Sequence, residues 1–213
     1  MPLPPAAPQR QLKHRRQIDV QVYSRGDGCW EVDAHLSDVK THDAHLAASV
    51  RPAGTPIHDM QLRLVVNQRL DILEAGSHSR WVPYPGQCDK FGAQTVDQTV
   101  DQEGNQAGNQ PGVASADAYT RLVGLNLLQG FRQALRERVG GVQGCTHITE
   151  LAQVLPTAVV QAFAGEVIDT LGDGADAQKP FQIDRCHALR SDGPTVLAHY
   201  PRWHVSAAPT RTV

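Results

Sequence analysis

Two stretches of the chain alternate apolar and polar residues with the period of two that is typical of strands. The first runs through residues 17–24, turns at residues 26–28 and continues through residues 29–38. The second runs through residues 57–66, turns, and continues through residues 69–79. Each stretch predicts a β-hairpin, and two successive hairpins predict an antiparallel sheet with one face towards the core.

The periodicity becomes helical in the second half of the chain. Apolar side chains recur every three or four residues from Tyr119 to Val139, and Gly140 follows them. This pattern predicts a first helix that ends at the glycine. A second helical pattern begins around Thr146 and reaches about as far as Ile168.

The order of the expected elements indicates the fold class. The segment PTVLAHYP near the C-terminus predicts a short final strand. Strands come first and helices after them, which predicts the α+β class: an N-terminal antiparallel sheet of hairpins, two or three helices and a short C-terminal strand. A doubly wound fold would need alternating strands and helices, and the glycine-rich motif of a dinucleotide site is missing from the sequence.

Composition separates a domain from its flanking segments. Residues 1–16 are rich in proline and then basic, without periodicity, so we expect a disordered tail. We expect a single α+β domain over residues 17–204 and a second tail over residues 205–213. Within the domain, residues 92–118 repeat TVDQ and GNQ and hold few large apolar side chains, which predicts a flexible insertion.

The charge balance limits the classes of partner. The 213 residues include 20 basic and 22 acidic side chains, a formal net charge of −2. This balance predicts no nucleic-acid partner, because phosphate binding needs a concentrated basic face. No apolar run is long enough for a membrane span, and the N-terminus lacks the apolar region of an export signal. We therefore expect a cytoplasmic protein that binds a small molecule, and the oligomeric state stays open.

One candidate site consists of cysteines and histidines. Cys145 and His147 stand at the expected start of the second helix, where unpaired N–H groups favour a thiolate. Cys88, Cys145, His147 and Cys186 would together form a Cys3His set for zinc or for iron, including an iron-sulfur cluster. The alternative is that the cysteines pack as small apolar side chains.

A metal-free centre uses the same thiol. Cys145 is then a nucleophile that a neighbouring imidazole activates. His147 is only two residues away and is poorly placed for this task on a helix, whereas His187 is the better partner if the fold brings it close.

A second candidate group lies in the first half of the chain. It consists of polar residues at the ends of the expected strands: Asp27, Asp33, Asp38, Lys40, His58 and Asp59. From this group we expect Asp38, Lys40 and His58 to perform acid–base chemistry, because a carboxylate beside a lysine or histidine suits proton transfer. The alternative is a turn at Asp27 and a surface ion pair between Asp38 and Lys40.

Six motifs in a fixed order resemble a bacterial family. They are SRGDGCWEVDAHLSDVK, GTPIHDMQLRLVV, PYPGQC, LVGLNLLQGF, RVGGVQGCTHITEL and FQIDRCHALRSDGPTVLAHYP. These motifs are similar to the DUF2889 family over roughly residues 17–204, and residues 92–118 depart from the family pattern. The resemblance implies a single domain that is associated with bacterial catabolism of aromatic or acyl compounds. The three cysteine positions also resemble those of NifU-type iron-sulfur scaffolds.

Three functional hypotheses follow. The first is a metal- or cysteine-dependent enzyme, a lyase or hydrolase, that acts on a small carboxylic, aromatic or acyl compound. The second is a sulfur or iron-sulfur carrier that uses the same cysteines. The third is an accessory protein that binds a ligand without turnover. The first is the one that we expect.

Overall fold

The computed structural model describes residues 3–47, 49–88, 117–174 and 177–206. The chain forms two compact units, residues 1–159 and residues 160–213, and each is described by itself. The expected insertion at 92–118 falls almost entirely outside the described residues. Within the described ranges, no helix combines the length and the apolar character that a membrane crossing requires.

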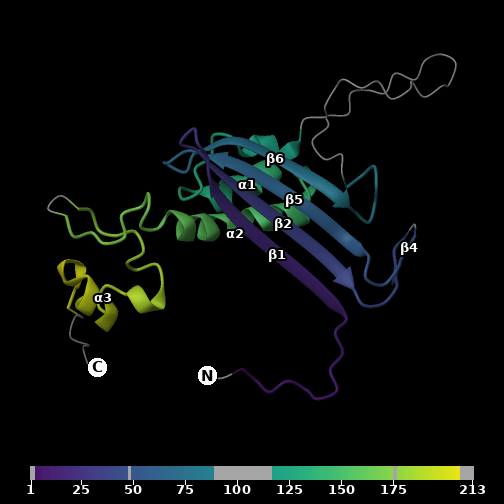
Figure 1. Ribbon diagram of the computed structural model, residues 1–213, viewed down its shortest axis with the longest axis horizontal. Helices are drawn as coiled ribbons and strands as arrows, with labels where there is room; N and C mark the ends of the chain where they lie inside the picture. The colour runs from purple at the N-terminus through teal and green to yellow at the C-terminus, as the bar shows by residue number, and fades with distance from the viewer. Residues whose placement is uncertain (1–2, 48, 89–116, 175–176, 207–213) are drawn as a thin grey trace, which may run out of the picture. The chain divides into compact units, whose positions relative to one another are not determined.

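The first unit contains the antiparallel sheet that the alternating patterns predict (Figure 1). Its strands lie in the order β1-β2-β5-β6, and both expected hairpins are confirmed. The strands are β1 (His14–Ser24), β2 (Trp30–Lys40), β5 (Pro56–Val66) and β6 (Ile72–Trp81). A small hairpin of β3 (Ala44–His45) and β4 (Val50–Arg51) connects β2 to β5. β1 begins inside the segment expected to be a disordered tail.

The two faces of the sheet differ in burial. Along β2, Val32, Ala34 and Leu36 are buried, and Asp38 continues the same buried row. Alternate side chains of a strand share a face, so Asp38 ends an apolar row with a carboxylate. It lies opposite His58 of β5 in the register, and the pairing shifts directly after it.

Helices cover this buried face in the first unit (Figure 1). They are η1 (Ala118–Leu122), α1 (Phe131–Val139) and α2 (Thr146–Phe163), whose last four residues are counted with the second unit. The exposed turn η2 (Gly141–Gln143) lies between α1 and α2 in the sequence. α2 begins at the predicted residue. The first predicted helix was too long, because Gly124 and Gly130 adopt positive φ and the residues between them hydrogen-bond to the β5–β6 turn.

The second unit is built from short elements. They are η3 (His187–Leu189), α3 (Pro194–His199) and η4 (Pro201–Trp203). The prediction of a short C-terminal strand was wrong, since that segment is α3. Pro194 occupies the first turn of α3, where its missing N–H costs nothing, and it favours a helix there.

Candidate functional site

Asp38 is the centre of a polar cluster on the buried face of the sheet. Its residue is 2% exposed. Arg16 donates from Nε to Oδ1 at 2.8 Å and from Nη2 to Oδ2 at 2.6 Å. His14 Nε2 lies 2.9 Å from Oδ1, and His58 Nδ1 lies 3.0 Å from Oδ2. Four donors therefore surround a single carboxylate.

These donors keep Asp38 ionised. Burial alone would raise its pKa, but the hydrogen bonds and charge of Arg16, together with His58 and His14, lower the pKa to about 2. An ionised carboxylate only accepts hydrogen bonds, so His58 Nδ1 and His14 Nε2 both donate to it. His58 is thereby held with its proton on Nδ1.

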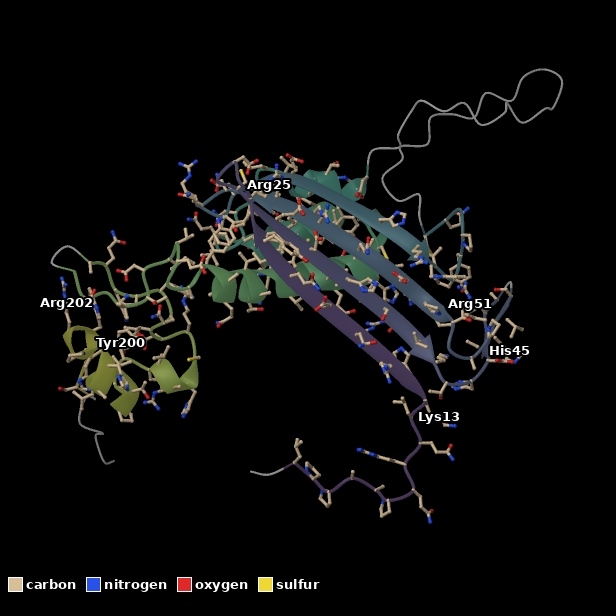
Figure 2. The ribbon with its side chains drawn as sticks, viewed as in Figure 1. Lys13, Arg25, His45, Arg51, Tyr200 and Arg202 are labelled. Carbon is tan, nitrogen blue, oxygen red and sulfur yellow. The ribbon has the colours of Figure 1, made fainter. Side chains whose placement is uncertain are left out.

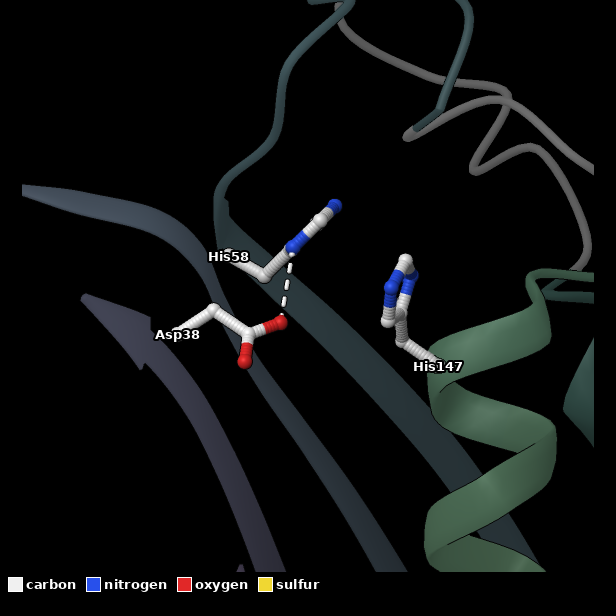
Figure 3. Close-up of side chains that lie close together, drawn as sticks. All are labelled: Asp38, His58 and His147. Carbon is white, nitrogen blue, oxygen red and sulfur yellow. Dashed lines mark hydrogen bonds and ion pairs between the residues drawn. The ribbon is translucent and has the colours of Figure 1, made fainter. Parts of the chain in front are cut away.

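The second half of the cluster comes from α2. The rings of His58 and His147 lie 3.8 Å apart between centroids, tilted by 33° (Figure 3). One ligand atom from each of Asp38, His58 and His147 lies within 4.8 Å of the other two. Among the described residues, these three side chains form a group that could hold a metal ion.

Both imidazoles favour the neutral form. Burial lowers the pKa of His58, the neighbouring His147 lowers it further, and Asp38 opposes this shift. Burial also lowers the pKa of His147, with a further contribution from the charge of Arg16. A neutral imidazole has a lone pair for a metal or for a proton, so the cluster is prepared for either chemistry.

The start of α2 is fixed by a buried phenol. The Oη of Tyr119 donates to Cys145 O at 2.8 Å and accepts from Cys145 N at 3.0 Å. It also lies 3.0 Å from Thr149 Oγ1. A Cβ on Gly144 would lie 2.5 Å from Val139 O and 3.0 Å from this phenol oxygen, so only glycine fits there. These contacts determine where His147 stands.

Cys145 lies at the edge of the cluster. Its Sγ is 3.9 Å from His147 Nδ1 and 3.8 Å from the Sδ of buried Met60. A separation of 3.9 Å is long for a hydrogen bond to sulfur. The thiol is thus next to the imidazoles without being one of the three clustered ligands.

The structure joins parts of both predicted groups. Asp38 and His58 of the proposed acid–base group meet Cys145 and His147 of the proposed thiol group. Lys40 lies two residues beyond Asp38 on the same face of β2, opposite His14 in the register.

The other expected metal ligands do not belong to the cluster of three. Cys88 is half-buried in a turn after β6, where its N–H donates to Tyr84 O at 3.0 Å. Cys186 is exposed and belongs to the second unit, as does His187. The Cys3His set remains a prediction, while the geometry of the first unit points to Asp38 and His58 beside His147.

The remaining acidic candidates lie outside this cluster. Asp27 accepts from Cys29 N in the β1–β2 turn. Asp33 pairs with Arg63 at 2.6 Å, and Asp59 lies 2.9 Å from His35 Nε2. The alternation of the strands places these two pairs on the opposite face of the sheet from Asp38.

That opposite face is hollowed, and two ion pairs lie along it. The hollow has a volume of about 690 Å³ and is lined in part by Asp33, His35 and Arg63. Arg63 is bound by Asp33, and His35 by Asp59. Within the described residues, the side chains that could together hold a metal ion are on the other face, so the candidate site is placed there.

Three charged or titratable members of the cluster were not predicted from the sequence. His14 and Arg16 fell within the expected tail, although they extend the alternation of β1 by two inward positions. Glu150, one turn along α2 from Thr146, accepts from Arg16 Nη1 at 2.6 Å. The continued alternation was a signal for the first two, whereas nothing in the local sequence indicates the contact of Glu150.

Comparison with known proteins assigns the family. The family described as protein of unknown function DUF2889 matches residues 14–104 and 109–161, so the chain belongs to it. A search of curated proteins and a search of solved structures each found no match. The expected family is confirmed, and these comparisons give no support to the similarity with NifU-type scaffolds. The match ends at residue 161, and it includes most of residues 92–118, which had been expected to depart from the family pattern.

Proposed function

We propose that the protein is a metal-dependent enzyme whose metal ion is bound by Asp38, His58 and His147. The observation that carries this proposal is the convergence of one carboxylate and two imidazoles within 4.8 Å. Such a set suits zinc or ferrous iron. Three protein ligands leave coordination positions for water and substrate, as in catalytic metal sites.

The distances support a chelated ion. Zinc–nitrogen and zinc–oxygen bonds are about 2.0–2.2 Å long, so two adjacent ligand atoms of one ion lie roughly 3.0–3.5 Å apart. Asp38 Oδ2 and His58 Nδ1 are 3.0 Å apart. These two atoms need to move little to bind the same ion. The ligand atom of His147 has to approach them by a small distance.

Binding exchanges one hydrogen bond for a metal bond. Because His58 Nδ1 donates to Asp38 in the metal-free chain, its proton must move to Nε2 before Nδ1 binds the ion. Arg16 and His14 keep their bonds to the carboxylate and orient it as outer partners of a metal ligand do.

The bound ion defines the class of reaction. A metal lowers the pKa of its water ligand and polarises a substrate carbonyl, which suits hydrolysis or the addition and elimination of water. The centre therefore supports the hydrolase or lyase activity expected from the sequence. Action in catabolism and a cytoplasmic location belong to the same proposal.

The test measures metal binding by the full chain. Protein stripped with chelator is titrated with Co²⁺, and the visible absorption of the bound ion reports its coordination. We expect one ion per chain, and we expect His58→Ala and His147→Ala to lose this binding. His45→Ala, which changes an exposed histidine of β3 (Figure 2), is the matched control and should bind normally. Absence of binding by the intact chain would contradict the proposal.

A second candidate is a cysteine nucleophile, which the 3.9 Å separation of Cys145 Sγ and His147 Nδ1 favours. The variant Cys145→Ser distinguishes the metal centre from the cysteine nucleophile. It should leave cobalt binding intact if the three-ligand centre is correct. Once a substrate is found, loss of turnover with retained cobalt binding would assign the chemistry to the thiol. An iron-sulfur carrier would need more thiolates than the one beside this cluster.

A further inference from the structure

Two cationic and two anionic side chains surround the paired histidines before a metal is bound. Arg16 from β1 and Lys40 from β2 are positive, whereas Asp38 from β2 and Glu150 from α2 are negative. The imidazoles of His58 and His147 favour the neutral form. A divalent ion added to these side chains leaves an excess of positive charge at the half-buried cluster.

Lys40 is the positive group that the cluster does not use. Arg16 is engaged by Asp38 and by Glu150 at 2.6 Å. Lys40 is half-buried and shares the inward face of β2 with Asp38. Within the described part of the chain, no ion pair engages its ammonium group.

Resting on the proposed metal centre, we infer that the substrate is a small carboxylate that binds an open position of the metal ion and is held by Lys40. A bound cation is the largest local charge in such a site, so an anionic ligand is favoured over a neutral one of the same shape. Lys40, which is opposite His14 in the register, adds a charge-assisted hydrogen bond to the carboxylate. Selectivity then comes from charge, and the metal ion positions the acid.

The experiment uses the cobalt-loaded full chain and simple probes. Acetate and benzoate are titrated, and changes in the cobalt absorption give their dissociation constants; acetamide and benzamide serve as neutral analogues. We expect binding of the acids and little response to the amides. Lys40→Met should weaken benzoate binding about tenfold or more, because a hydrogen bond to a charged group is lost.

Two further variants make the result specific. Lys40→Arg keeps the charge and should retain most of the affinity. Lys13→Met removes the same charge from an exposed residue just before β1 and should leave the affinity unchanged. Equal binding of amides and acids, or equal losses in Lys13→Met and Lys40→Met, would overturn the inference while the metal centre stands. If the intact chain binds no cobalt, both proposals are wrong.

Discussion

Arg16 and Asp38 lie opposite each other in the register of β1 and β2, and the guanidinium donates to both oxygens of the carboxylate. The contact is bidentate and Asp38 is buried, so this ion pair is stronger than an ordinary surface ion pair. It also joins the sheet to α2, because Arg16 donates to Glu150 as well. The charge that a metal would use is thus fixed in place by the fold.

Replacement of Asp38 should weaken both metal binding and folding. Asp38→Asn removes the anionic ligand and leaves Arg16 without its buried counter-charge. We expect the free energy of unfolding to fall by about 2–3 kcal/mol and the cobalt affinity to fall at least tenfold. Urea unfolding and cobalt titration measure these changes.

Asp33→Asn is the control for this substitution. Asp33 is on the same strand and forms a similar pair with Arg63, but both side chains are more exposed. Its effect on stability should stay below about 1 kcal/mol, and cobalt affinity should not change. Similar losses in the two variants would show that Asp38 has no special role.

Stability of the metal-free chain should fall as the solution becomes mildly acidic. The pKa values of His58 and His147 are lowered on folding, below the 6.5 of an unperturbed histidine, so the unfolded chain takes up protons first. The free energy of unfolding therefore declines as pH falls from about 7 through the folded pKa values, then levels off. Asp38, with a pKa of about 2, stays ionised in this window.

Urea unfolding between pH 7.5 and pH 5 in the presence of chelator measures this decline. His58→Gln should make it shallower, because one of the two histidines no longer titrates. His45→Gln should leave the slope as it is. An unchanged slope in His58→Gln would show that His58 does not contribute.

Loss of the Tyr119 hydroxyl should loosen the start of α2. Tyr119→Phe leaves the Cys145 backbone groups without their buried partner, at a cost of about 1–3 kcal/mol. Because His147 is two residues further on, cobalt affinity should fall as well. Gly144→Ala should act in the same direction through its clash with Val139 O. Urea unfolding and cobalt titration measure these changes, and Tyr23→Phe, which removes an exposed hydroxyl, serves as the control in both.

Arg51 should be a structural cation at the end of the sheet (Figure 2). It is 9% exposed, lies 4.7 Å above the ring of Trp81, and donates to Pro56 O and Val82 O. Arg51→Met should lower the free energy of unfolding by about 2–3 kcal/mol. Arg51→Lys should restore little of the lost stability, since a single ammonium group cannot reproduce the hydrogen bonds of the planar guanidinium. Full rescue by lysine, seen in urea unfolding, would contradict this role.

The hydrophobic periodicity of the sequence predicted the main strands and the start of α2. The alternation in the two hairpins predicts β1 with β2 and β5 with β6, because burial of one face imposes a period of two. The start of α2 was predicted from the residues around Cys145. Short apolar runs were less informative: the segment of α3 holds too few apolar positions to separate a strand from a helix.

The candidate site was only partly predictable. Asp38 and His58 were chosen for their chemistry, and so were Cys145 and His147, but as two separate groups. Their meeting depends on how α2 packs against the sheet, which is a contact between distant parts of the sequence. No local period carries that information, and the same holds for the contact of Arg16 with Glu150.

The order of the three proposed metal ligands along the chain has a consequence for synthesis. His58 follows Asp38 by 20 positions, whereas His147 follows His58 by 89 positions. All four donors to Asp38 come from β1 and β5, so the carboxylate can be satisfied while α2 is still being made. A growing chain can therefore pair this carboxylate before it has the third proposed ligand, and loading of the proposed metal ion would be a late event in its maturation.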